Sequence, residues 1–239
     1  MKVFVAGATG ATGRLVVDQL LERKIEVKVV VRSPERLTDE SRKNTLLNVI
    51  EGSLLNFNDE EFAQIVDDCD AVVSCLGHNL TLKGIYGAPR RLVSEATRRL
   101  CNAVKVNNRD LPVKYILMNT TGNRNPDADK PMPLGEKIVL GLIRLLVPPH
   151  SDNERAANYL NRVIGQSDKN IDWVAVRPDT LLNAEEVSEY ELFPSPVRSP
   201  IFNAGQTSRI NVAQFMAELI TNKGLWDKWK GQMPVIYNK

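Results

Sequence analysis

Short apolar runs alternate with amphipathic segments along most of the chain. Runs such as residues 2–6 (KVFVA) and 27–31 (VKVVV) are rich in β-branched residues. They predict buried strands, because a strand covered on both faces is almost continuously apolar. The strands predicted in this way are residues 2–6, 27–31, 46–50, 70–76, 113–119, 171–176 and 233–237.

Between these runs, apolar residues recur at the spacing of one helix face. In the segment after the first strand, Leu15, Val16, Leu20 and Leu21 follow this pattern. Alternation of strands and helices favours right-handed crossovers and a parallel sheet with helices on both sides. The predicted helices are residues 11–23, 60–66, 89–106, 153–164 and 211–221.

The pattern changes after Pro178. Residues 185–205 contain several prolines and little periodicity, which is typical of an ordered loop region. Asn211 is the expected N-cap of the last predicted helix. Because the chain shows no linker, we expect one α/β domain over residues 1–239, with a doubly wound, mostly parallel sheet. Within it, residues 179–239 are expected to form a small C-terminal extension that contributes the substrate-side wall.

Composition and charge narrow the classes of partner. The chain has 239 residues, of which 43% are hydrophobic and 25% charged, with a formal net charge of +2. This is the composition of a globular protein, and the near balance of charge argues against nucleic acid or an anionic membrane as the main partner. The first apolar run is too short for a signal peptide, and none is long enough for a membrane span. The three cysteines lack metal-ligand spacing, so we expect reduced thiols, no metal and a cytoplasmic location.

A glycine triplet lies between the first predicted strand and the first predicted helix. Gly7, Gly10 and Gly13 have GxxGxxG spacing, with Thr9 and Thr12 between them. Glycines in this context allow a tight turn, close approach of backbone to a pyrophosphate, and close packing of helix on strand. The start of the helix would offer N–H groups to the anion, and the threonines would offer hydroxyl groups. The alternative is a merely tight turn, but the strand–turn–helix–strand context favours a dinucleotide site.

The type of residue at the end of the second predicted strand indicates which of the two nicotinamide dinucleotides is bound. Binders of NAD usually place Asp or Glu there to accept from the ribose 2′-hydroxyl. Residues 31–34 contain no acid, and Arg32 stands there with Arg36 about one turn later. A guanidinium group can bind a 2′-phosphate through two hydrogen bonds. The sequence therefore predicts NADP(H) in preference to NAD(H), although Arg36 alone is equally well interpreted as a solvated surface residue.

Five segments in fixed order resemble a known family: VAGATGATGRLVV, VVVRSPERL, DAVVSCLG, VKYILMNTTG and IDWVAVRPDTL. They are similar to the atypical short-chain dehydrogenase/reductase group with a Rossmann-type NAD(P)-binding fold. Within that group, the chain resembles the NADPH-dependent flavin reductase/biliverdin reductase type and its NmrA-like relatives. The likeness covers nearly the whole chain.

The resemblance implies roles for particular residues. Ser53, where the family often has Asp, would contact adenine more weakly, and Thr120 would lie near the nicotinamide and position it or the substrate. Backbone groups of Pro178 would bind the carboxamide, and a contact with cofactor is the favoured role of His78. The cofactor-binding residues implied in this way are Gly7, Thr9, Gly10, Ala11, Thr12, Gly13, Arg32, Arg36, Ser53, Leu54, Leu76, Gly77, His78, Thr120 and Pro178.

The Tyr-x-x-x-Lys dyad of typical short-chain dehydrogenases is missing. No tyrosine of the chain is followed four residues later by lysine, and residues 151–155, on the helix that would carry it, read SDNER. His150 is interpreted as a loop residue without a chemical role, and Ser151 or Asp152 as a cap of the helix that follows.

Two functions remain compatible with a cofactor site without this dyad. One is an NADPH-dependent reductase of a small flavin-, quinone- or tetrapyrrole-like hydride acceptor, with water supplying the proton. The other is an NADP(H)-binding sensor without turnover, of the NmrA-like kind, which reports to a protein partner.

Residues 134–147 form an apolar segment outside these motifs. Their length and the charges of Glu136, Lys137 and Arg144 exclude a membrane span. We expect a helix packed over the substrate cleft, with a partner or dimer surface as the alternative.

Overall fold

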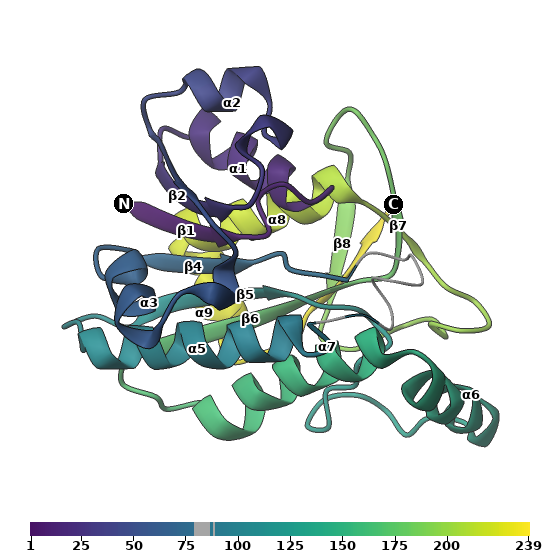
Figure 1. Cartoon of the computed structure of the whole chain (residues 1–239). Coiled ribbons are helices and arrows are strands. Elements are labelled where there is room, and N and C mark those ends of the chain that lie inside the picture. Colours follow the sequence, from purple (N-terminus) through teal and green to yellow (C-terminus); the bar gives the residue numbers. More distant parts are fainter. Residues whose placement is uncertain (79–86, 88) are drawn as a thin grey trace.

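An eight-stranded sheet forms the centre of the computed structural model, which describes residues 1–78, 87 and 89–239. The strand order is β3-β2-β1-β4-β5-β6-β10-β8, and every pairing is parallel except that of β8 with β10 (Figure 1). The strands are β1 (Lys2–Ala6), β2 (Glu26–Val31), β3 (Leu47–Glu51), β4 (Ala71–Ser74), β5 (Val113–Met118), β6 (Ile171–Pro178), β8 (Tyr190–Phe193) and β10 (Val235–Asn238). The predicted doubly wound, mostly parallel sheet is confirmed.

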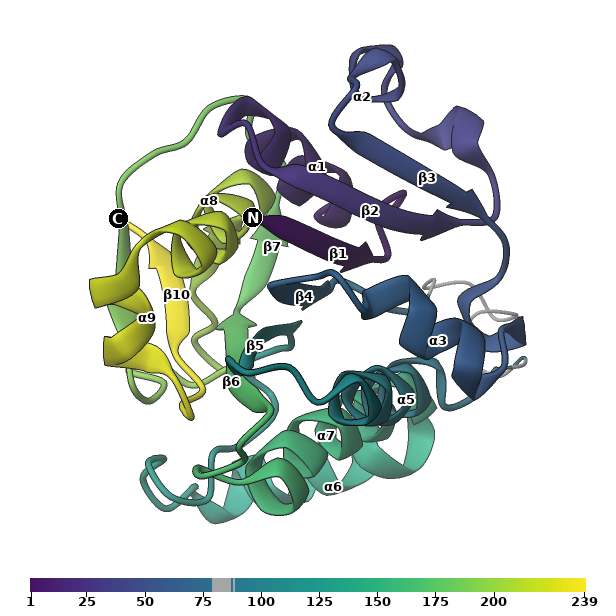
Figure 2. The ribbon, with the colours of Figure 1, turned by 90° about the vertical axis from the view of Figure 1, so that its left-hand side faces the viewer.

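Helices cover both faces of this sheet. Figure 2 shows α1, α8 and α9 on one face and α3, α5 and α7 on the other. A small parallel pair, β7 (Thr180–Leu182) and β9 (Gln206–Ser208), lies outside the main sheet. The helices are α1 (Gly13–Glu22), α2 (Asp39–Lys43), α3 (Asp59–Val66), α5 (Leu92–Asn107), α6 (Leu134–Leu146), α7 (Pro148–Tyr159), α8 (Arg209–Thr221) and α9 (Lys223–Trp229).

Two apolar cores result from the alternation of side chains along each strand. In β1, Val3 and Val5 belong to the core shared with α1 and α8, whereas Phe4 and Ala6 belong to the core shared with α3 and α5. This explains why the strands read as continuous apolar runs rather than as alternating ones. Among the described residues, no helix is long and apolar enough to cross a bilayer.

Several local expectations are corrected. Residues 185–205 are not entirely irregular, because β8 lies within them as an antiparallel edge strand of only four residues, too short to leave a pattern. Helix α8 is capped by the side chain of Ser208 instead of Asn211, which is buried. The segment after Pro178 also supplies two strands of the main sheet and the helices that pack beside α1.

A buried ion pair joins β6 to the irregular segments beyond the sheet. The side chain of Arg177 is fully buried, and its Nη1 and Nη2 donate to the two oxygens of Asp129 at 2.6 and 3.0 Å. The remaining N–H groups donate to the backbone oxygens of Met233, Asn123 and Pro194. All five donors of the guanidinium group are therefore satisfied.

Replacing Arg177 by methionine should lower the free energy of unfolding by about 3–5 kcal/mol, because it leaves the buried Asp129 carboxylate without its partner. Urea denaturation would measure this loss. Arg98→Met is the matched control: it removes an exposed pair with Glu95 and should change stability by less than about 1 kcal/mol. Equal effects of the two substitutions would contradict this interpretation.

Candidate functional site

The turn between β1 and α1 needs glycine at two positions. Gly7 has φ +81°, and a Cβ there would lie 2.6 Å from the carbonyl oxygen of Cys75. A Cβ on Gly13 would lie 2.1 Å from the carbonyl oxygen of Gly7. Real Cβ atoms do not approach backbone so closely, so the turn keeps its shape only with glycine at both sites.

The start of α1 presents free backbone donors. Thr12 is the N-cap, its side chain makes no capping hydrogen bond, and the first turn contains no acidic residue. Within the described part of the chain, the N–H groups of Ala11 and Thr12 have no acceptor. Unpaired N–H groups at the positive end of a helix dipole are suited to bind a phosphate anion.

A cavity of about 180 Å³ opens beside this turn. It lies at the carboxyl edge of the sheet, where ligands bind in open α/β folds. Arg32 and Arg36 line it and are both exposed, so their guanidinium groups can meet an anion without losing an internal partner. Nine residues predicted from the sequence meet in its lining: Gly7, Thr9, Gly10, Arg32, Arg36, Ser53, Leu54, Leu76 and Gly77.

His78 is not among the residues that line this cavity. Its Nε2 lies 2.9 Å from Oδ2 of Asp152, and both side chains are buried. Asp152 also accepts from the backbone N–H groups of Val93 and Ser94, in the first turn of α5. The sequence predicts that Ser151 or Asp152 caps the helix that follows. The structure corrects this for Asp152, which lies inside α7 and caps α5 instead.

Thr120 and His150 lie close together beyond the end of β5. A Cβ on Gly122 would be 3.0 Å from Cε1 of His150 and 3.8 Å from Oγ1 of Thr120. His150 Nε2 lies 3.6 Å from Oε1 of Glu154, four residues later on α7. Burial raises the pKa of Glu154, but its contacts with His150 and Arg144 outweigh burial and hold the pKa below its ordinary value.

His150 was interpreted from the sequence as a loop residue, and the structure corrects this because it lies in the first turn of α7. The spacing His150-x-x-x-Glu154 equals that of the missing Tyr-x-x-x-Lys dyad, and this signal could have drawn attention to the pair.

A second cavity, of about 190 Å³, adjoins the ends of β5 and β6. Thr121, in its lining, makes a side-chain hydrogen bond with Asp179, and its backbone N–H donates to the carbonyl oxygen of Pro178. Loss of solvation raises the pKa of the half-buried Asp179, despite hydrogen bonds that oppose the shift. The lining residues are Thr121, Arg124, Glu136 and residues 129–133 and 195–200.

The two cavities give the carboxyl edge of the sheet two different chemistries. The first has free N–H groups, threonine hydroxyls and guanidinium groups, which fit the phosphates of a dinucleotide. The second has walls from irregular segments, and Thr121 of its lining contacts the protonatable carboxyl group of Asp179. Among the described residues, no group of three or more His, Cys, Asp or Glu side chains could hold a metal ion.

Comparison with protein families identifies the family of the chain. A family model described as NAD(P)H-binding matches residues 7–223, which begins at the glycine turn and includes both cavities. The chain belongs to this NAD(P)H-binding family. The predicted NAD(P)-binding family is thereby confirmed, and the structural neighbours described next share the predicted Rossmann-type fold.

Solved structures share the fold of this NAD(P)H-binding protein at low sequence identity. A short-chain dehydrogenase/reductase from Veillonella parvula, in complex with NADP, is 18% identical, with a TM-score of 0.71 over 99% of this chain and 94% of that one. ChuY, an anaerobilin reductase from Escherichia coli O157:H7, is 16% identical, with a TM-score of 0.69 over 100% and 97% of the two chains. An oxidoreductase from Lactococcus lactis is 18% identical, with a TM-score of 0.70 over 100% and 91%.

A curated relative matches over a shorter stretch. An uncharacterized chloroplastic protein of Arabidopsis thaliana is 38% identical over 76 residues, which are 32% of this chain. The match spans only 27% of that relative's length.

Replacing Gly13 by alanine should weaken the binding of NADPH about tenfold or more, because the new Cβ must displace the backbone of Gly7 and distort the turn. Titration calorimetry would measure the dissociation constant. Gly141→Ala on α6 is the control, since its Cβ would meet nothing within 4 Å and should leave affinity unchanged. Unaltered affinity in the Gly13 variant would show that the turn does not bind the dinucleotide.

Proposed function

We propose that this protein is an NADPH-dependent reductase that transfers hydride directly to a flavin-, quinone- or tetrapyrrole-like acceptor. The observation that carries the proposal is the first cavity, in which the glycine turn and two exposed guanidinium groups lie together with no acid at residues 31–34. A 2′-phosphate would replace water around Arg32 and Arg36, whereas the 2′-hydroxyl of NAD would find no carboxylate acceptor there.

The second cavity is the proposed place of the acceptor. NADP(H), when bound, supplies the hydride. Residues 129–133 and 195–200, which line this cavity, would enclose the acceptor and exclude water. Thr120, which precedes Thr121 of the lining, would orient the acceptor or the carboxamide. The chain contributes mainly proximity and orientation, which suffice when solvent can deliver the proton to the reduced acceptor.

A panel of acceptors tests this function. Purified protein is mixed with NADPH and with FMN, a quinone, dichlorophenolindophenol or a linear tetrapyrrole, and absorbance of the reduced nicotinamide is followed. Saturable oxidation with at least one acceptor is the expected result. Tight binding of NADPH with no turnover across the panel would support the second candidate, a sensor that reports to a protein partner. The absence of the Tyr-x-x-x-Lys dyad from the sequence favours that candidate.

Arg32→Glu should reduce the preference for NADPH over NADH by about tenfold or more, because a charged hydrogen bond of about 1.5–3 kcal/mol is replaced by repulsion of the 2′-phosphate. The ratio of dissociation constants for the two dinucleotides is the measurement. Arg162→Glu makes the same change of charge at an exposed residue outside the cavity and should leave the ratio intact. Equal affinity of the parent for both dinucleotides would refute the selectivity.

His150→Ala should keep the turnover number within about threefold of the parent, because in the proposed mechanism solvent supplies the proton. Initial rates at saturating NADPH and acceptor would measure it. A positioned general acid contributes about 10²–10⁴-fold. A loss of that size, with unchanged affinity for NADPH, would make His150 the proton donor and overturn this part of the mechanism.

A further inference from the structure

Helix α6 presents its apolar side chains to solvent. The expectation that it packs over the cleft is wrong for Leu134, Ile138, Leu142 and Leu145, which are 73%, 57%, 52% and 77% exposed. These four residues, called here the α6 stripe, follow helical spacing and therefore share one face. The alternative raised by the sequence, an interaction surface, is the interpretation that fits this exposure.

The opposite face attaches the helix to the protein. Glu136 and Leu140 are buried, and at about 100° per residue they lie on the side opposite the α6 stripe. Lys137 and Arg144, seven residues apart, lie together on one flank. The stripe thus faces away from the body of the molecule, and Figure 1 shows α6 at its periphery.

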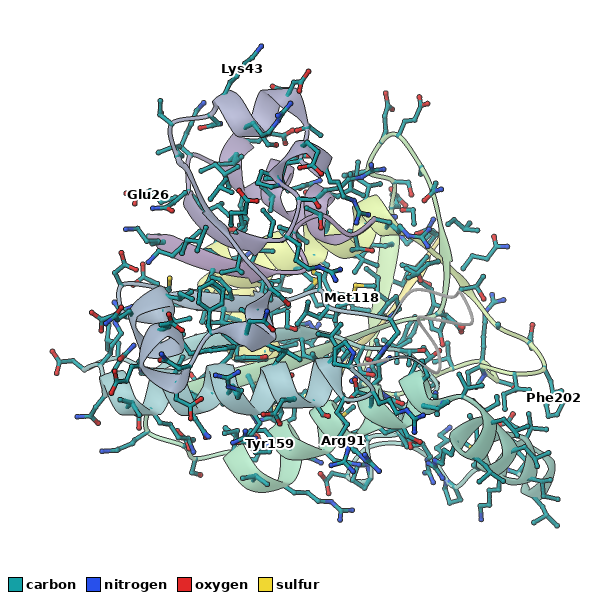
Figure 3. The ribbon with its side chains drawn as sticks, in the orientation of Figure 1. Glu26, Lys43, Arg91, Met118, Tyr159 and Phe202 are labelled. Atoms are coloured by element: carbon teal, nitrogen blue, oxygen red, sulfur yellow. The ribbon has the colours of Figure 1, made fainter. Side chains whose placement is uncertain are left out.

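A second segment adds apolar residues at the same corner. Residues 195–200 line the second cavity together with residues 131–133 and Glu136, which is at the start of α6. In and beside that segment, Val197 and Phe202 are 59% and 67% exposed. Figure 3 shows Phe202 at the edge of the molecule. Two chain segments far apart in sequence therefore expose apolar side chains together.

Basic residues gather at the other end of α6. A cavity of about 280 Å³ is lined by Arg90, Arg91, Arg144 and Arg155, together with Pro148, Ser151 and Asp152. Arg144 is paired with Glu154. Within the described residues, Arg91 and Arg155 have no carboxylate partner, and both are exposed. Guanidinium groups this close repel one another, and an anion with several oxygens would relieve the repulsion.

We propose that the α6 stripe and this arginine cavity form a docking surface for an anionic lipid bilayer. An apolar helix face inserts into the boundary between headgroups and acyl chains, while flanking basic residues bind lipid phosphates. The net charge of +2, which argued against such a partner, averages over the whole chain and hides this local cluster. The surface requires no turnover, so the proposal does not depend on the proposed function.

Sedimentation with vesicles tests the proposal on the full chain. Vesicles of phosphatidylcholine alone are compared with vesicles that contain phosphatidylcholine and phosphatidylglycerol in equal amounts. The parent should bind the anionic vesicles more tightly. The triple variant Ile138→Ser, Leu142→Ser, Leu145→Ser should lose about tenfold or more in binding, because its apolar insertion is removed. Arg91→Gln and Arg155→Gln should each lose about fivefold, for anionic vesicles only.

A matched control removes exposed apolar residues elsewhere. Val106 and Leu111 are 75% and 78% exposed. Val106 is in the last turn of α5 and Leu111 follows that helix, at the end opposite to Arg91. Val106→Ser, Leu111→Ser should bind vesicles as the parent does, and calorimetry with NADPH should show that every variant is folded. The proposal is overturned if the parent does not bind anionic vesicles, or if the triple and control variants bind them equally. It is also overturned if the parent is a dimer and the triple variant a monomer, and neither binds vesicles.

Discussion

The guanidinium group of Arg177 is the contact on which the second half of the site depends. Its five N–H groups join β6 to the backbone before β10, to the segment after β5, and to Pro194 after β8. Because a buried guanidinium group tolerates no missing partner, these segments must keep their relative positions. Asp129 belongs to the wall of the second cavity, so the shape of that cavity follows from one ion pair.

Asp152 has a comparable function beyond the end of β4. It connects α7 to the first turn of α5 and to His78 after β4. In both cases a buried charge positions irregular backbone that the sheet itself cannot hold. The glycine turn needs no such device, because β1 and α1 are continuous with it and its geometry is set by steric exclusion. The site thus combines one locally determined half with one half determined by long-range contacts.

This division explains what could be predicted from the sequence. The parallel strands are predicted correctly, because periodicity is a local property. The spacing that marks the glycine turn and Arg32 as candidate site residues is local as well. The pairing of Arg177 with Asp129 spans 48 residues, and that of His78 with Asp152 spans 74, so no local pattern reports them. The exposure of α6 could not be predicted either, because an apolar helix looks the same in sequence whether it is packed or presented to a partner.

Two carboxyl groups, Glu154 on α7 and Asp179 after β6, differ in what they can do chemically. The pKa of Glu154 is lowered by His150 and Arg144 in spite of its burial, so it stays ionised to lower pH and stabilises the positive charge of Arg144. The pKa of Asp179 is raised by lost solvation, so it holds its proton to higher pH than an ordinary aspartate. When their environments drive the pKa values of two carboxyl groups apart, the group with the raised pKa can donate a proton and the group with the lowered pKa acts as a fixed negative charge. Should an acceptor require a proton from the protein, Asp179 has the environment of a donor and Glu154 does not.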